Sequence, residues 1–304
     1  MPLHIDYRPQ TLDEVVGNEN IKESLQSIFA REDKPHAYLL HGPSGTGKTT
    51  IARIMAKMLK CSDQDFFEFN MSNLRGIDHV RELAQNCHYS PVDGKVKVYL
   101  LDEVHRQTKD AQHAILKILE DTPSHVYFIL CTTEPERLLK TIHTRCTGYQ
   151  TQSLNNKKLK VLIKRILEQE KVEDFSATVI NEIINVADGS PRQALVILDQ
   201  VIDMDDEKAL AAIASFTVIE AEAIDICKAI ATHATWKDMR PLVKAALLNI
   251  EPENLRQSIL GYLCTILLDK SDDRISALID VFGENVFSSG KAGLVNMCYV
   301  ASKI

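Results

Sequence analysis

The chain has 304 residues, of which 45% are hydrophobic and 25% are charged, and its formal net charge is −7. This is the composition of an ordinary globular protein, and the length corresponds to two or three domains. Apolar runs are short and interrupted by charge, which argues against a membrane span, and the acidic balance does not favour nucleic acid as a partner.

The N-terminus and the cysteines carry few signals. The first ten residues contain neither the basic nor the apolar region of a secretory signal. The seven cysteines are widely spaced, and no two of them form a CxxC pair. The sequence therefore has no metal or redox motif of that type, and we expect a cytoplasmic protein with reduced thiols.

Short β-rich runs alternate with helical patterns between residues 37 and 152. Two of the runs, within VKVYLLDE and HVYFILCTT, are almost continuously apolar and end in polar residues, which is typical of strands buried on both faces. The alternation predicts an α/β core with a parallel five-stranded sheet and flanking helices, in a strand order that the spacing does not fix. The candidate strands are 37–41, 66–70, 95–101, 126–131 and, more weakly, 148–153.

Beyond residue 153 the pattern is helical, with an acid-rich break at 203–208. We therefore expect a core domain over 1–153, a helical lid over 154–206 and an all-helical domain over 207–304. The predicted helices are 155–170, 176–187 and 191–201 in the lid, and 219–231, 237–248, 253–268, 274–282 and 286–302 after it.

Residues 42–49 read GPSGTGKT, a complete GxxxxGK[ST] pattern between a predicted strand and a predicted helix. Its glycines allow the positive φ angles that turn backbone N–H groups toward one point, and the helix N-terminus adds partial positive charge. We expect Lys48 to reach the β- and γ-phosphates of a nucleotide and Thr49 to bind Mg²⁺. The alternative, a glycine-rich turn with a surface lysine, is disfavoured by this context. The predicted phosphate-binding residues are Gly42, Pro43, Ser44, Gly45, Thr46, Gly47, Lys48, Thr49 and Thr50.

Two polar strand ends complete the predicted site. Asp102 and Glu103 follow the buried strand VYLL, at the edge where open α/β sheets bind ligands. We expect Asp102 to hold Mg²⁺ and Glu103 to orient and deprotonate the attacking water, although such a pair can also cap a helix. Thr132 and Thr133 follow another buried strand, where one of them either contacts the γ-phosphate or caps a helix.

Three stretches carry a family resemblance. The stretch YRPQTLDEVVGNENI is similar to an adenine-site motif. The block that begins with KVKVYLLDEVH and ends with TRC is similar to a segment that begins with a Walker B motif and ends with an SRC motif. The stretch ADGSPRQALVILDQ is similar to a sensor-2 helix. On these residues the chain resembles the AAA+ clamp-loader ATPases, most closely the bacterial tau/gamma subunits and more distantly phage loaders and the small subunits of replication factor C. The resemblance covers about residues 5–203, and beyond them only the helical character of the family's collar domain agrees.

The resemblance implies roles for single residues. Thr133 would be sensor 1, Arg145 an arginine finger that reaches the nucleotide of a neighbouring subunit, and Arg192 the sensor-2 residue. Ser190 and Pro191 independently predict a helix start, so that Arg192 lies in a first turn where an anionic ligand would offset its unfavourable interaction with the helix dipole. For both arginines the alternative is an ordinary surface position. The adenine would be bordered by Tyr7, Arg8, Pro9, Val15, Val16 and Gly17.

The sequence differs from the family pattern at two places, one of which concerns zinc and the other the predicted arginine finger. Bacterial tau/gamma subunits insert a four-cysteine zinc module after the phosphate-binding helix, whereas Cys61 stands alone here, so we predict no zinc. TRC replaces SRC, a change that keeps a hydroxyl, a charge and a thiol. Because the sequence ends at Ile304, we expect a compact form similar either to phage-type loaders or to the short gamma product, and the sequence does not separate the two.

The resemblance implies an ATP-driven motor subunit of a DNA sliding-clamp loader, with DNA- and clamp-stimulated hydrolysis of ATP and Mg²⁺ as cofactor. Its partners would be the other subunits of a pentameric assembly, the sliding clamp and primer-template DNA, with no membrane. One alternative is another AAA+ DNA motor, for branch migration or initiation. The other is a non-hydrolysing scaffold subunit, which intact Lys48, Thr49 and Glu103 argue against. The candidate DNA contacts, each of which is also an ordinary surface residue, are Arg75, Gly76, Arg81, Arg106 and Lys109.

Overall fold

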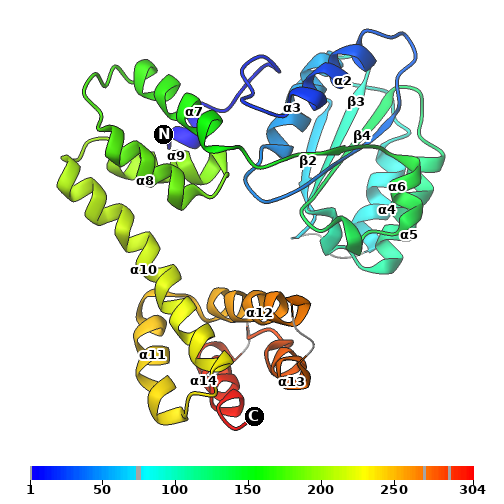
Figure 1. Ribbon diagram of the computed structural model, residues 1–304. Helices are drawn as coiled ribbons and strands as arrows, with labels where there is room; N and C mark the ends of the chain where they lie inside the picture. The colour runs from blue at the N-terminus through cyan, green and yellow to red at the C-terminus, as the bar shows by residue number, and fades with distance from the viewer. Residues whose placement is uncertain (1, 73–76, 270–271, 287–288) are drawn as a thin grey trace. The chain divides into compact units, whose positions relative to one another are not determined.

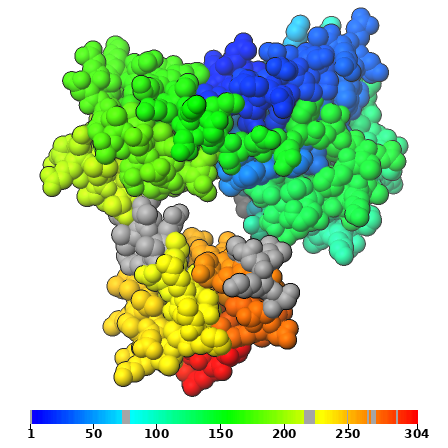
Figure 2. All heavy atoms as spheres, in the orientation of Figure 1, coloured from blue at the N-terminus to red at the C-terminus, as the bar shows by residue number. Residues whose placement is uncertain are grey.

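The computed structural model describes residues 2–72, 77–269, 272–286 and 289–304. The chain divides into two compact units, Met1–Asp206 and Glu207–Ile304, each with apolar cores of its own. Both units are closely packed (Figure 2), with colours from blue to green in the first and from yellow to red in the second. None of the helices within the described ranges has the length and apolar character needed to cross a membrane.

The first unit contains the predicted five-stranded sheet, and every strand pair in it is parallel. The strand order is β2-β3-β4-β1-β5, so that β3, β4 and β1 are neighbours at its centre. β4 is buried at every position, as its continuous apolar run requires. The strands are β1 (Ala37–His41), β2 (Phe66–Asn70), β3 (Lys97–Asp102), β4 (Val126–Thr132) and β5 (Thr147–Gln150).

Helices cover both faces of this sheet (Figure 1). Tyr38 and Leu100 face α2 and α3, whereas Phe128 and Leu130 face α4, α5 and α6. This layering brings the carboxyl ends of the three central strands to one edge, which is where open α/β sheets bind ligands. The helices on the first face are α2 (Glu19–Phe29) and α3 (Lys48–Met58), and those on the second are α4 (Ile77–Asn86), α5 (Lys109–Glu120) and α6 (Lys140–Arg145).

Three helices that pack on one another form the lid. Asn155 and Ser190 cap two of them, because each side chain accepts a hydrogen bond from an N–H of the first helical turn. A short helix at the N-terminus, α1 (Leu3–Asp6), packs against the last of the three, where the Leu3 N–H donates to Asp199 Oδ1 at 3.2 Å. The lid helices are α7 (Asn156–Gln169), α8 (Ala177–Ala187) and α9 (Pro191–Val201).

The second unit is helical, as predicted, but two of its predicted boundaries are wrong. α10 runs without interruption from Asp206 to Ala231. The helix therefore begins within the break predicted at 203–208, and not at residue 219 as predicted. The acidic residues at its start are favourable there, because carboxylates stabilise a helix N-terminus. The last helix begins at Gly290, whose φ is +54°, rather than at 286. The helices are α10 (Asp206–Ala231), α11 (Trp236–Asn249), α12 (Pro252–Asp269), α13 (Asp273–Phe282) and α14 (Gly290–Ala301).

Candidate nucleotide-binding site

The glycine-rich loop lies between β1 and α3, as predicted. Gly42, Gly45 and Gly47 have φ values of +142°, +73° and +94°, so the loop uses the conformations that glycine allows. Lys48, the first residue of α3, is 6% exposed, and its Nζ donates to the carbonyls of Gly42 and Pro43 at 2.8 Å each. Burial lowers the pKa of this ammonium group, while the neighbouring Cys131 and the site carboxylates oppose that shift.

Thr49 and Asp102 meet across the loop. The Thr49 hydroxyl donates to Asp102 Oδ2 at 2.8 Å, and Asp102 Oδ1 accepts from the Glu103 N–H at 2.9 Å. A hydroxyl and a carboxylate oxygen are hard oxygen ligands of the type that Mg²⁺ prefers, and Mg²⁺ sites of NTPases take most other ligands from water and phosphate. These two residues therefore fit a magnesium site. In the described ranges no group of three or more His, Cys, Asp or Glu residues could hold a metal.

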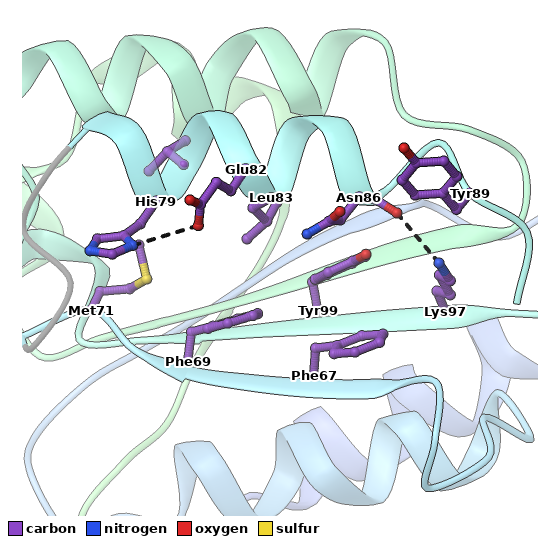
Figure 3. Close-up of a pocket in the computed structure, with 11 residues that line it drawn as sticks. Phe67, Phe69, Met71, His79, Glu82, Leu83, Asn86, Tyr89, Lys97 and Tyr99 are labelled. Carbon is purple, nitrogen blue, oxygen red and sulfur yellow. Dashed lines mark hydrogen bonds and ion pairs between the residues drawn. The ribbon is translucent and has the colours of Figure 1, made fainter. Parts of the chain in front are cut away.

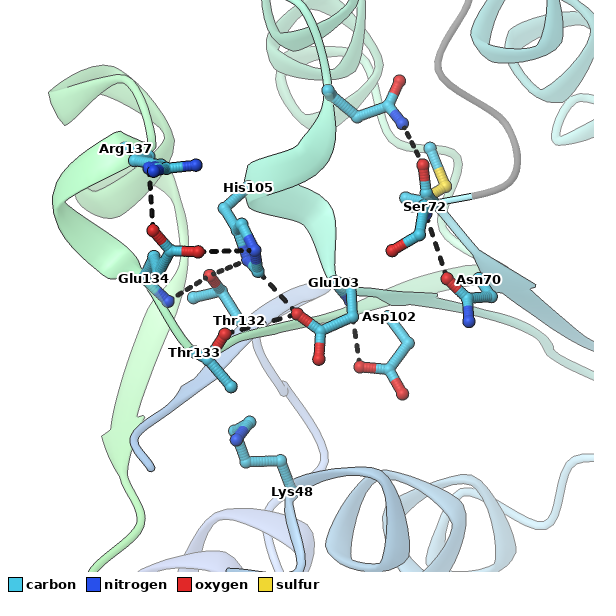
Figure 4. Close-up of polar contacts among 12 residues, drawn as sticks. Lys48, Asn70, Ser72, Asp102, Glu103, His105, Thr132, Thr133, Glu134 and Arg137 are labelled. Atoms are coloured by element: carbon cyan, nitrogen blue, oxygen red, sulfur yellow. Dashed lines mark hydrogen bonds and ion pairs between the residues drawn. The ribbon is translucent and has the colours of Figure 1, made fainter. Parts of the chain in front are cut away.

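Glu103 turns away from Asp102 and toward the end of β4 (Figure 4). Its backbone is left-handed, with φ of +55°, and its Oε2 accepts from the Thr133 hydroxyl at 3.3 Å. The sequence left open which of two threonines faces the site. In the structure Thr133 contacts the carboxylate, whereas Thr132 is fully buried and turns to His105.

His105 is absent from the predicted site residues. Its side chain is fully buried, with Nδ1 3.0 Å from Thr132 Oγ1 and 3.3 Å from Glu103 Oε2. Nε2 lies 3.1 Å from Glu134 Oε1, at an ion-pair distance but without hydrogen-bond geometry. Burial lowers the pKa of the imidazole, and Glu103 and Glu134 oppose that shift. His105 lies within the quoted block KVKVYLLDEVH, but the sequence did not indicate its contacts, because its partner Thr132 is at the end of β4.

A cavity of about 200 Å³ lies between the loop and the lid. Lys48, Thr49, Asp102 and Glu103 line it from the loop and β3, and Pro9, Val15, Val16, Leu162 and Leu195 add apolar surface. This combination suits a nucleotide, whose phosphates need donors and whose base needs apolar surface. Among the predicted residues, Gly17, Gly42, Pro43 and Thr133 are outside the lining. The full lining is His4, Tyr7, Arg8, Pro9, Glu14, Val15, Val16, Ser44, Gly45, Thr46, Gly47, Lys48, Thr49, Thr50, Asp102, Glu103, Leu162, Pro191, Arg192 and Leu195.

The lid contacts the loop directly. A Cβ on Gly45 would lie 2.2 Å from Ser190 Oγ, so only glycine fits this approach. Arg192 lines the cavity from the first turn of α9, and its N–H lies 3.5 Å from the Gly45 carbonyl. The Thr46 and Thr151 hydroxyls form a buried contact of 2.7 Å, which ties the loop to the segment that leads into the lid.

The remaining predicted residues that the structure describes do not line this cavity. Arg145 ends α6, is half exposed and pairs with Glu120 Oε1 at 2.9 Å. Arg81, Arg106 and Lys109 are exposed, on α4, at the end of the short turn Val104–Arg106, and at the start of α5. Arg75 and Gly76 lie outside the described residues.

A second cavity, of about 350 Å³, lies under α4 (Figure 3). Phe67 and Phe69 of β2 and Tyr99 of β3 line it, and the ring of Tyr99 stacks on both phenylalanines. Lys97 Nζ donates to the Asn86 carbonyl at 3.4 Å on its rim. Its lining has no glycine-rich loop and no strand-end carboxylate, so we assign nucleotide binding to the first cavity.

The parallel sheet with β3, β4 and β1 as neighbours at its centre, the glycine-rich loop, the acidic end of β3 and the helical lid together define an AAA+ fold. Solved structures of the RuvB Holliday junction branch migration motor of Thermotoga maritima share this fold. One matches with a TM-score of 0.63 at 23% identity, covering 86% of this chain and 91% of that one. Family models match as DNA polymerase III, delta subunit over residues 66–155 and as Sigma-54 interaction domain over residues 15–80.

Curated relatives identify the family. The DNA polymerase III subunit tau of Escherichia coli is 31% identical over 287 residues, which is 86% of this chain and 44% of that protein. The subunit gamma/tau of Mycobacterium tuberculosis is 36% identical over 225 residues, or 66% of this chain and 39% of that protein. This chain thus spans less than half the length of these relatives. It belongs to the AAA+ clamp-loader ATPase family.

Proposed function

We propose that the chain is an ATP-driven motor subunit of a DNA sliding-clamp loader, which opens the clamp and loads it onto primer-template DNA in the cytoplasm. The observation that carries the proposal is the cavity in which Lys48, Glu103 and Arg192 converge from the loop, the sheet and the lid. A scaffold subunit has no need of this convergence. The proposal that the task is clamp loading is based on the similarity to clamp-loader relatives.

Each residue at the site has a chemical role in this proposal. Thr49 and Asp102 would hold Mg²⁺, which would supply positive charge to neutralise the triphosphate of ATP. Loop N–H groups and Lys48 bind the phosphates, and Arg192 approaches the γ-phosphate from the lid. Glu103, with Thr133 beside it, orients and deprotonates the attacking water. The base lies against the apolar lining residues, between Tyr7–Pro9 and the lid.

Arg145 acts on the nucleotide of a neighbouring subunit. Its exposed position on α6, away from its own cavity, fits an arginine that leaves its Glu120 partner when a neighbour docks. Hydrolysis then depends on assembly, which we take to be pentameric and to hold the clamp and the DNA. Exposed Arg81, Arg106 and Lys109 contact DNA phosphates, a binding mode that weakens with salt.

Replacing Lys48 tests the site. Lys48→Ala removes a charge-assisted contact to the phosphates, so ATP affinity should fall at least about 100-fold. The measurement is titration with a fluorescent ATP analogue. Lys57→Ala, an exposed lysine on the same helix, is the matched control and should bind normally. Equal ATP affinity in both variants would contradict the assignment of the nucleotide to this cavity.

Replacing Arg145 tests action between subunits. Arg145→Ala should bind ATP normally and lose hydrolysis by about 10³-fold, because a finger acts mainly in the transition state. Mixing it with Lys48→Ala chains, which contribute an intact Arg145, should restore part of the rate. The ATPase rate should also rise when primer-template DNA and a bacterial sliding clamp are added. Full activity of the lone variant contradicts the finger role, and no stimulation contradicts the clamp-loader function.

A further inference from the structure

Glu103 needs an orienting contact that packing does not provide. Its side chain is 33% exposed and borders the cavity, so few neighbours restrict its rotamers. A water-activating carboxylate must nevertheless be held close to its productive geometry. The polar groups on its Oε2 are the Thr133 hydroxyl and the His105 imidazole, both at 3.3 Å.

His105 is itself held rigidly. The ring is fully buried and contacts Thr132 Oγ1, which belongs to the central strand β4 and also accepts from the Glu134 N–H at 3.1 Å. The imidazole is therefore fixed to the sheet, on the side of Glu103 away from Lys48 (Figure 4). It does not line the cavity, whereas Glu103 does.

We propose that His105 is a positioning residue for hydrolysis, which presents an N–H at Nδ1 to Glu103 Oε2 and keeps that carboxylate ordered at the cavity. This inference rests on the proposed function. Nδ1 is the nitrogen that matters, because it is the one that faces Glu103: it lies at an ion-pair distance of 3.3 Å from Oε2, and its hydrogen bond to Thr132 Oγ1 holds it there. The ring binds no substrate and transfers no proton in this role.

Two amide substitutions separate the two ring nitrogens. The amide nitrogen of Asn occupies the place of Nδ1, and that of Gln occupies the place of Nε2. His105→Asn should therefore keep kcat for ATP hydrolysis within about threefold of that of the natural chain, whereas His105→Gln should lower kcat at least about tenfold. In both variants the KM for ATP should stay within about twofold, because the ring does not bind the nucleotide.

The experiment is steady-state ATPase of the full chain with primer-template DNA, together with melting temperatures. The exposed His113 on α5 is the control, and His113→Gln and His113→Asn should leave kcat unchanged. If His105→Gln fails to fold, Thr132→Val decides, since it removes the hydroxyl that holds the ring with little change of shape. Lower kcat at unchanged KM supports the proposal.

Three results would overturn this role. They are natural kcat in His105→Gln, rescue by Gln rather than Asn, and natural kcat in Thr132→Val. The proposed function fails separately, because it predicts ATP hydrolysis by the natural chain before any substitution is made. A natural chain that hydrolyses ATP while the His105 variants behave like the His113 controls refutes the positioning role and leaves the function intact.

Discussion

Gly45 carries the contact between the phosphate-binding loop and the lid. Its φ of +73° is costly for any residue with a Cβ, and that Cβ would lie 2.2 Å from Ser190 Oγ. Gly45→Ala should therefore separate loop and lid, with a loss of stability of about 1–3 kcal/mol and weaker ATP binding. Thermal melting and ATP titration measure the two effects.

Gly148 supplies the control for that substitution. It lies in β5 with an ordinary backbone, and a Cβ added there would have no neighbouring side chain or strand within 4 Å. Gly148→Ala should therefore leave the melting temperature and the ATP affinity near those of the natural chain. The same melting temperature and ATP affinity in the two variants would show that the lid does not need this close approach.

The predictability of a site residue depends on whether its partners are close in sequence. Lys48, Asp102 and Glu103 lie in contiguous patterns, and the structure brings them to one cavity. Thr151 bonds Thr46 across 105 positions, so only the folded chain reveals the contact. The same holds for His105, which lies in the turn Val104–Arg106 and whose partner Thr132 ends β4.

The strands could be predicted closely, because their hydrophobic runs define them. The exceptions are β5, predicted over 148–153 and observed over Thr147–Gln150, and β3, predicted from 95 and observed from Lys97. The backbone just before it bonds to a side chain instead of to the sheet. Asp65, which is fully buried, accepts hydrogen bonds from the N–H groups of Val92, Asp93 and Gly94 at 2.7–3.0 Å and from the Ser62 hydroxyl at 2.8 Å.

These bonds make Asp65 an anchor whose effect depends on pH. Burial alone would raise its pKa, but the three N–H groups and the Ser62 hydroxyl outweigh burial and lower the pKa to about 2, from 3.8. A lowered native pKa stabilises the fold above about pH 4, by about 2 kcal/mol here, and this contribution disappears as the pH falls through 2.

Asp65→Asn should therefore cost about 2 kcal/mol at neutral pH and less at pH 2 to 3, because the carboxylate is then being protonated in the natural chain as well. Urea unfolding at both pH values measures the difference. Asp63→Asn, two residues away and exposed, should unfold like the natural chain. A penalty for Asp65→Asn that is the same at both pH values would contradict the anchor.

The two units have separate cores, and the second contains an ion pair that the sequence did not indicate. Arg256 and Glu253 are 7% and 11% exposed, and the Glu253 carboxylate also accepts from the Val286 N–H at 2.9 Å. Hydrogen bonds from Arg256 hold the pKa of Glu253 at about 2, from 4.5, against the opposing effect of burial.

Loss of this pair should affect only the second unit. Glu253→Gln leaves Arg256 without its charge partner, so the helices after residue 207 should lose about 3 kcal/mol of stability at neutral pH. That contribution is present above about pH 4.5 and fades as the pH falls through 2. Hydrogen exchange of α12 and α13 measures it, whereas ATP affinity, which belongs to the first unit, should not change. Weaker ATP binding would mean that the units depend on each other.

The left-handed backbone of Glu103 has an evolutionary consequence. Glycine, aspartate and asparagine adopt a positive φ more readily than glutamate does. Glycine and aspartate are each one nucleotide change away from a glutamate codon. A drifting gene copy can therefore lose the carboxylate that we propose activates water without straining the fold, and in that proposal its product would still bind nucleotide through Lys48. A single mutation of this chain could thus give a subunit that does not hydrolyse ATP and that assembles with subunits that do.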